Sequence, residues 1–373
     1  MPTRCCRRRP PGSTTASCRS MAARTRSSAA SSPARWRKAR PMDFQLSDDH
    51  RMLQDSLRGI LTRHTGEALW PALVEAGVPA ALLTEAEGGF DGSGAAVALI
   101  FEEMGRAGVA LPLIPTMIAA AAFAQAGQPA DEGASHAFAD AEPGARYDRG
   151  VAISADGDCL TGRKTMVAGA EDAAAFLVTT ADAMWRVEAG AAGLALRPYP
   201  MLDGQRGADL TLEGTPALRL GSLTDFAVPL ARGVLAHSAY ALGCITASVE
   251  LTLDYLRTRK QFGQPLIAFQ ALAHRAADLA VEVEQARSAV VNLASHLDDE
   301  APLRDRHLQA CKVTVGRVAR LVAEEAVQLH GGIGMTEEYA LAGHVRRLLA
   351  ADTAMGDADW HLDRFARGEP AWS

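Results

Sequence analysis

The chain has 373 residues and a formal net charge of −6, with 48% hydrophobic, 22% charged and 5% aromatic residues. This length suffices for two or three domains of ordinary size and a sizeable core. No uninterrupted run of about 18 apolar residues occurs, so we expect no membrane-spanning helix. The cysteines show no CxxC or Cys/His ligand spacing, so we expect neither a metal site nor a disulfide framework. Reduced cysteines of this kind favour a cytoplasmic protein.

The first 41 residues differ in charge from the rest of the chain. They contain ten Arg and Lys38 but no Asp or Glu, which leaves 27 Lys+Arg against 44 Asp+Glu, a net charge of −17, in the remainder. An acidic body argues against a nucleic-acid partner. The leader is as basic as a transit peptide but lacks the apolar core of a secretory signal. We predict that residues 1–41 are a disordered basic extension from an over-extended start, and that the folded protein begins at Met42.

Residues 42–130 have the pattern of an N-terminal helical domain. Apolar residues recur at helical spacing from Met42 onward, and Ser47 before two Asp residues suits a helix N-cap. The stretch "EAEGGFDGSG" predicts a loop because of its glycines. Residues 95–111 predict another helix, ended by prolines, and an Ala-rich helix continues to about residue 126.

The pattern changes over residues 131–226 and then returns to helix over residues 227–373. The stretch "VAISADGDCLTGRKTMVAGA" alternates and turns at two X-Gly pairs, as expected of short antiparallel strands. Helical spacing then covers 228–258, 267–296, 303–330 and a segment after Thr336, which favours an antiparallel four-helix bundle. The predicted fold is α+β and mostly α: an N-terminal helical domain, a small middle antiparallel β domain, and a C-terminal bundle.

Two motifs in the last region are specific. Residues 255–279 read "YLRTRKQFGQPLIAFQALAHRAADL", and residues 326–339 read "AVQLHGGIGMTEEY". With these motifs and the three-part order, the chain from Met42 onward resembles the acyl-CoA dehydrogenase family. A weaker likeness covers "ADAEPGARYD" and "LTGRKTMVAGA". The resemblance implies an oxidoreductase that binds FAD and acyl-CoA.

The resemblance also implies which residues contact the ADP half of the FAD: Arg259, Gln261, Phe262, Phe269, Gln270, Leu272, Gln328, Gly331 and Gly332. Arg259 offers a fixed charge to a pyrophosphate, and the glycine pair lets main-chain N–H groups approach it. Taken singly, a basic helix end or a Gly-Gly C-cap has a structural explanation, but their joint spacing favours the cofactor. In the family these residues reach a neighbouring subunit's flavin. A homo- or heterotetramer and an electron acceptor such as an electron-transfer flavoprotein are therefore implied.

Removal of the α-proton of an acyl thioester requires a carboxylate base, while the flavin accepts the β-hydrogen as hydride. The resemblance places this base at Met355 or, as in some members, at Ala231, and neither side chain accepts a proton. Asp357 is a conceivable substitute, although on a helix it points about 100° away from the usual position. We expect His237 to have no role in proton transfer.

The positions that the resemblance places near the flavin ring are also changed. Ala141 and Ala168 stand where the family has hydroxyl residues, Arg146 and Tyr147 replace Gly and Ser, and Met166 replaces a Trp. We therefore predict a non-catalytic subunit of a heteromeric acyl-CoA dehydrogenase that lends its ADP contacts to a catalytic partner. Two alternatives stay open: a self-sufficient homotetramer with a base such as Asp357, and a flavin-free structural adaptor.

Overall fold

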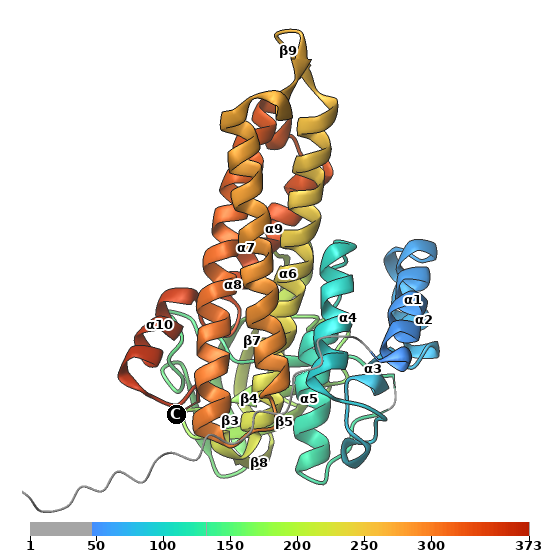
Figure 1. Ribbon diagram of the computed structural model, residues 1–373. Coiled ribbons are helices and arrows are strands. Elements are labelled where there is room, and N and C mark those ends of the chain that lie inside the picture. Colours follow the sequence, from blue (N-terminus) through green and yellow to red (C-terminus); the bar gives the residue numbers. More distant parts are fainter. Residues whose placement is uncertain (1–46, 132, 373) are drawn as a thin grey trace, which may run out of the picture. The chain divides into compact units, whose positions relative to one another are not determined.

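The computed structural model describes residues 47–131 and 133–372 (Figure 1). The predicted extension, residues 1–41, and the predicted start at Met42 lie outside the described residues. The described chain is α+β and mostly α, as the sequence predicts, with small sheets between two groups of helices. The domain divisions at residues 41, 130 and 226 stay predictions.

Among the described residues, five α-helices precede the strands: α1 (Asp48–Arg63), α2 (Leu69–Glu75), α3 (Val78–Ala81), α4 (Gly94–Arg106) and α5 (Leu113–Gln125). The predicted N-cap of α1 is confirmed, because the Ser47 hydroxyl accepts a hydrogen bond of 3.1 Å from the His50 N–H. Helix α4 packs closely on α6 (Ala227–Thr258). A Cβ on Gly243 of α6 would lie 2.1 Å from the main-chain oxygen of Glu102, so only glycine permits this approach.

The middle region forms two four-stranded sheets over a shared apolar core. The first has the order β1 (His136–Ala139), β4 (Ala175–Thr179), β5 (Ala183–Glu188) and β8 (Leu218–Ser222). The second has the order β2 (Ile153–Asp156), β3 (Cys159–Ala168), β7 (Arg206–Pro216) and β6 (Leu194–Pro200). All neighbours are antiparallel except β1 and β4, which are parallel. The predicted small antiparallel β domain is confirmed, with this one parallel pair as an exception, for which β2 and β3 provide the crossover that parallel strands need.

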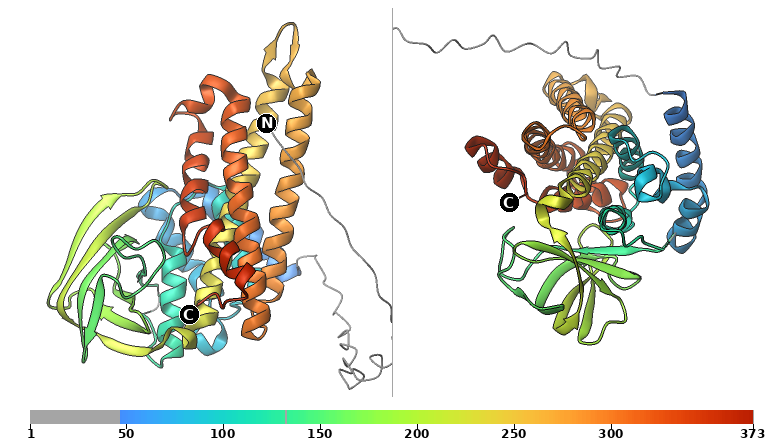
Figure 2. Two further views of the ribbon diagram at one scale, coloured as in Figure 1. Left: turned by 90° about the vertical axis from the view of Figure 1, so that its left-hand side faces the viewer. Right: turned by 90° about the horizontal axis from the view of Figure 1, so that it is seen from below.

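The C-terminal helices are α6, α7 (Gln270–Ser295), α8 (Ala301–His330), α9 (Ala340–Thr353) and α10 (Ala358–Arg367). Figures 1 and 2 show α6, α7 and α8 side by side along the bundle, with the sheets at one end. At the other end, β9 (Lys260–Gln261) and β10 (Gln264–Pro265) form a short hairpin between α6 and α7. The last predicted helix is in fact two, because the chain leaves helical geometry between Ala354 and Asp357.

Helix α6 lies at the centre of the helical core, where it packs against α4, α5, α7, α8 and α9. With the short turn before it, Leu223–Thr258, it is long and apolar enough by composition to cross a membrane, and its most apolar 18-residue window has a mean hydropathy of 1.3. Within the protein, however, 78% of its most apolar window is buried. Its apolar composition is therefore accounted for by its central position in the core.

Candidate functional site

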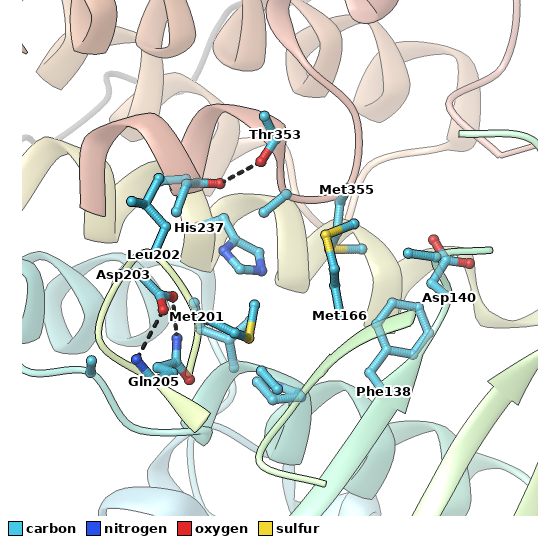
Figure 3. Close-up of a pocket in the computed structure, with 18 of the residues that line it drawn as sticks. Phe138, Asp140, Met166, Met201, Leu202, Asp203, Gln205, His237, Thr353 and Met355 are labelled. Atoms are coloured by element: carbon cyan, nitrogen blue, oxygen red, sulfur yellow. Dashed lines mark hydrogen bonds between the residues drawn. The ribbon is translucent and has the colours of Figure 1, made fainter. Parts of the chain in front are cut away.

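A cavity of about 560 Å³ opens between α4, α5, the sheets, α6 and α9 (Figure 3). This volume is in the range of small-molecule sites. Most of the wall is apolar, and its hydrophobic residues include Phe101, Met104, Leu111, Ile114, Ile118 and Phe138. Polar and charged side chains also line it, among them Asp140, Glu142, Arg146, Asp148, Asp203, Gln205, His237, Tyr240 and Arg347.

Two methionines line this cavity with a left-handed backbone. Met166 has φ of 54° and Met355 has φ of 55°, a conformation that side chains other than Gly, Asn and Asp rarely adopt. Backbone outliers of this kind concentrate at functional sites. Met355 occupies the expected base position, and its thioether cannot take a proton. The other position, Ala231, is wholly buried in α6 and does not line the cavity.

Buried groups hold the link between α9 and α10 that carries Met355. The Lys312 ammonium of α8 donates three hydrogen bonds of 2.7–3.1 Å to main-chain carbonyl oxygens at the end of α9, those of Ala351, Asp352 and Ala354. The His361 Nε2 donates to the Met355 carbonyl oxygen at 3.1 Å. Burial lowers the pKa of Lys312 to about 8 and that of His361 to about 3. The unusual backbone at Met355 is thus fixed from two sides.

Asp357 lies just beyond this link and is the N-cap of α10. Its carboxylate accepts hydrogen bonds from the Trp360 N–H at 2.8 Å, from the Tyr147 hydroxyl at 3.1 Å and from the Arg146 guanidinium. Burial acts in the opposite direction, but these bonds hold the pKa of Asp357 below its usual value. A carboxylate so engaged is a weak base, and it does not line the cavity. The prediction that Asp357 shares a helix with Met355 is wrong, because the chain breaks between them.

A buried ion pair fixes the loop that presents Arg146 and Tyr147. The Lys164 ammonium lies 2.8 Å from the Glu142 carboxylate, and both side chains are fully buried. The same carboxylate accepts three main-chain N–H groups, those of Gly150, Val151 and Ala152. Lys164 also donates to the Asp140 carbonyl oxygen and the Thr179 hydroxyl. Because every member is hydrogen-bonded, this network holds residues 140–152 in one geometry.

His237 projects from α6 at the cavity wall (Figure 3). Its ring has no hydrogen-bond partner among the described residues. Burial lowers the pKa of His237 to about 3, and the charge of Lys312 acts in the same direction. The imidazole is therefore neutral, with one N–H to donate. Its lack of a role in proton transfer stays a prediction, but its place at the cavity was not foreseen.

The second candidate region, which we call the tip, comprises residues 259–270 and 328–335 at the far end of the bundle. Phe262 and Gly263 form the two-residue loop of the hairpin, with φ of 51° and 82°, as a type I′ turn requires. Phe262 is 90% exposed. The two motifs meet here, since the Tyr255 ring stacks on His330 at 4.6 Å and the Tyr339 hydroxyl lies 3.2 Å from His330 Nε2.

The polar side chains that the sequence assigns to ADP contacts are exposed at the tip: Arg259, Gln261, Gln270 and Gln328. Phe269 and Leu272 are half-buried beside them. No carboxylate of the described residues lies within 4 Å of the Arg259 guanidinium. A Cβ on Gly331 or Gly332 would meet nothing within 4 Å, so their main chain is open to a ligand. These residues fit the pyrophosphate half of an FAD.

The cavity does not fit the ring half equally well. The positions of the hydroxyl donors hold Ala141 and Ala168, and the Arg146 guanidinium is already bound by Asp357. The tip and the cavity are also far apart, because Arg259 follows His237 by 22 positions along α6 and its C-cap, a rise of about 33 Å (Figure 1). The tip of one chain therefore does not complete the cavity of the same chain.

Comparison with known proteins gives one consistent family. The family model "Acyl-CoA dehydrogenase, C-terminal domain" matches residues 227–369. Acyl-CoA dehydrogenase FadE28 of Mycobacterium tuberculosis is 31% identical over 323 residues, which cover 80% of this chain and 91% of that protein.

Solved structures with the same fold include a variant of the Tcur3481-Tcur3483 steroid ACAD. It has a TM-score of 0.77 and 28% identity, and the match covers 86% of this chain and 97% of that one. The ChsE4-ChsE5 complex from Mycobacterium tuberculosis has a TM-score of 0.79 over 87% of this chain and 98% of that one. At 23% identity, the latter shows the fold alone.

Proposed function

The chain belongs to the acyl-CoA dehydrogenase family of oxidoreductases, and we propose that it is the non-catalytic subunit of a heteromeric member. In this proposal its tip binds the ADP half of an FAD whose ring lies in a catalytic partner. FAD, when bound, supplies the acceptor for the β-hydrogen of an acyl-CoA thioester. Arg259 pairs with the pyrophosphate, and the glycine pair at 331–332 offers main-chain N–H groups.

One contrast carries this proposal. At the cavity, Met355 and Ala231 supply no carboxylate base, and Asp357 is held by Arg146, Tyr147 and Trp360. At the tip, the side chains for the ADP half are exposed and Arg259 has no acidic neighbour within the described chain. Without a base, the cavity cannot carry out the dehydrogenation even with a flavin bound. The donors of the tip lie about 33 Å from this cavity along α6, so they suit a flavin held in another subunit.

A relative supports the same arrangement. The name Tcur3481-Tcur3483 of the 28%-identical steroid ACAD joins two different chains. We propose a heterotetramer of two unlike chains, with a fatty acyl or steroid side-chain thioester as the partner's substrate and an electron-transfer flavoprotein or a similar protein as acceptor. Cys159, Cys244 and Cys311 are free thiols, which supports the cytoplasm as the proposed location.

The two alternatives are less well supported. A self-sufficient homotetramer needs a base, and Asp357 has a lowered pKa and three hydrogen-bond donors instead of a place at the cavity wall. A flavin-free adaptor does not need the exposed donors of the tip, because these residues make few contacts that stabilise the fold.

The test is purification of the chain alone and together with a catalytic acyl-CoA dehydrogenase subunit from the same genome. Alone, the chain is expected to be colourless and inactive. With its partner, we expect equal amounts of both subunits, one FAD for each pair, and turnover of an acyl-CoA. A yellow and active preparation of the chain alone would overturn the proposal.

A further inference from the structure

A cationic side chain at the cavity wall, Arg347, has no acidic partner among residues 47–131 and 133–372. We propose that the cavity binds an apolar carboxylic acid, with the ligand's carboxylate at Arg347. This goes beyond the function proposed above, because such binding needs neither a base nor a flavin.

Arg347 projects from α9 and lines the cavity. Its Nε is buried and has no hydrogen-bond partner, and no carboxylate of the described residues lies within 4 Å of its guanidinium. The neighbouring Arg346 differs, because it points to the surface and pairs with Glu337 at 3.1 Å. The guanidinium of Arg347 lies between two loops, since a Cβ on Gly108 would be 3.4 Å from one terminal nitrogen and a Cβ on Gly204 3.9 Å from the other.

The titratable groups beside Arg347 are uncharged at neutral pH. Burial lowers the pKa of His344 to about 4, and the Arg347 charge acts in the same direction. Burial raises the pKa of Cys244 to about 12 and raises that of Tyr240 as well. The Tyr240 hydroxyl donates to the Val109 carbonyl oxygen at 2.9 Å, which leaves its oxygen free only to accept. The part of the chain that the structure describes therefore gives this cation no anionic partner in direct contact.

Asp203 is an acidic residue of the cavity wall next to Gly204, which borders the Arg347 guanidinium, and its carboxylate is engaged elsewhere. Its two carboxylate oxygens accept hydrogen bonds from the Gln205 main-chain N–H at 3.0 Å and from the Gln205 side-chain amide at 2.8 Å. A partly buried cation without a paired anion is unfavourable unless a ligand supplies the charge. A carboxylate does this best, because the planar guanidinium binds it through two parallel hydrogen bonds.

The rest of the wall defines the remainder of the ligand. Leu111, Ile114, Ile118 and Phe138 provide an apolar surface for a hydrocarbon body. The neutral ring of His237 supplies one further donor on the same wall. The cavity therefore selects a molecule with one anionic end and an otherwise apolar body.

The proposal is tested by isothermal titration of the full chain, alone or in its complex, with decanoate and with 1-decanol at pH 7. Both probes have the same hydrocarbon chain, so the difference between them reports the carboxylate. We expect decanoate to bind roughly 10- to 100-fold more tightly, the usual gain of charge-assisted hydrogen bonds. Equal affinities, or no binding of decanoate, would overturn the proposal. The readout does not involve FAD, so it is independent of the subunit role proposed above.

Two substitutions at neighbouring arginines make the test specific. Arg347→Met is expected to abolish the preference for decanoate while 1-decanol still binds. Arg346→Met, one residue away and on the surface, is expected to leave the preference unchanged. If Arg347→Met does not fold, Arg347→Lys serves instead, and it should keep the charge but only part of the preference. An unchanged preference in either Arg347 variant, or an equal loss in Arg346→Met, contradicts the assignment.

Discussion

The tip and the cavity share an unusual backbone but differ in what their side chains do. In the described parts of the chain, three residues other than glycine have positive φ: Met166 and Met355 at the cavity, and Phe262 at the tip. Next to the cavity, Lys164 belongs to a buried ion pair and Asp357 caps α10, so both charges hold the fold. At the tip, the polar side chains assigned to ADP contacts are exposed. These two charges beside the cavity are therefore structural, whereas Arg347 in the cavity wall and the polar side chains of the tip are available for a ligand.

The largest effect is expected from removal of the buried cation beneath the cavity loop. Lys164→Met leaves the Glu142 carboxylate buried and unpaired, which we expect to lower the free energy of unfolding by about 3–5 kcal/mol. Urea denaturation measures the change. The double variant Lys164→Met/Glu142→Gln removes the stranded charge and should recover part of the loss.

The matched control is the same substitution at the tip. Lys260 is exposed, so Lys260→Met is expected to stay within about 0.5 kcal/mol of the parent protein. A similar loss of unfolding free energy in Lys164→Met and Lys260→Met would contradict the contrast between a buried structural network beside the cavity and exposed side chains at the tip.

The next effect concerns FAD and not stability. Arg259→Ala in the complex with the catalytic partner is expected to weaken FAD binding by about 1.5–3 kcal/mol, roughly 10- to 150-fold, because a charge-assisted hydrogen bond to phosphate is lost. Flavin retention during dilution, followed by absorbance, measures it. Arg257→Ala is the control: Arg257 is also exposed, and it pairs loosely with Asp254 at 3.8 Å. Equal flavin loss in both variants would indicate a general effect of surface charge.

Much of the fold was predictable because its helices obey local rules. The Ser47 cap, the long helices and the alternating strands all follow from spacing within the segment itself. The parallel pairing of β1 with β4 was not predictable, since alternation does not reveal which strand lies beside which. The break before α10 had a local signal that was missed: Gly356 followed by Asp357 is a typical helix end and N-cap.

The candidate sites were predictable to different degrees for a related reason. The tip residues are contiguous in two motifs, so sequence alone placed them together. Arg347 and Tyr240 line the cavity because of the faces that α9 and α6 turn toward it. Helical spacing in the sequence does not show which face that is. One signal was present at Arg346-Arg347, because adjacent helical residues point about 100° apart, so both arginines cannot face solvent equally.

The smallest expected effect separates the two interpretations of Asp357. Asp357→Ala removes the N-cap of α10 and is expected to cost about 1 kcal/mol of unfolding free energy. Asp357→Asn keeps a capping oxygen, removes the charge and should cost less. The folded-state pKa of Asp357 is below its usual value. The carboxylate therefore stabilises the fold fully above the ordinary pKa of about 4, and this contribution is lost as pH falls through the folded-state value.

The difference in unfolding free energy between the parent protein and Asp357→Asn should thus be constant from pH 7 to about pH 5. It should shrink below about pH 4, as measured by urea denaturation at each pH. A structural cap affects only this stability, so acyl-CoA turnover by the complex at pH 7 should be unchanged in Asp357→Asn. A base behaves in the opposite way, because its loss abolishes turnover without any change in stability. Loss of turnover in Asp357→Asn at unchanged stability would mean that this chain, and not the partner, carries the catalytic base. The cavity would then be the catalytic site of a self-sufficient homotetramer.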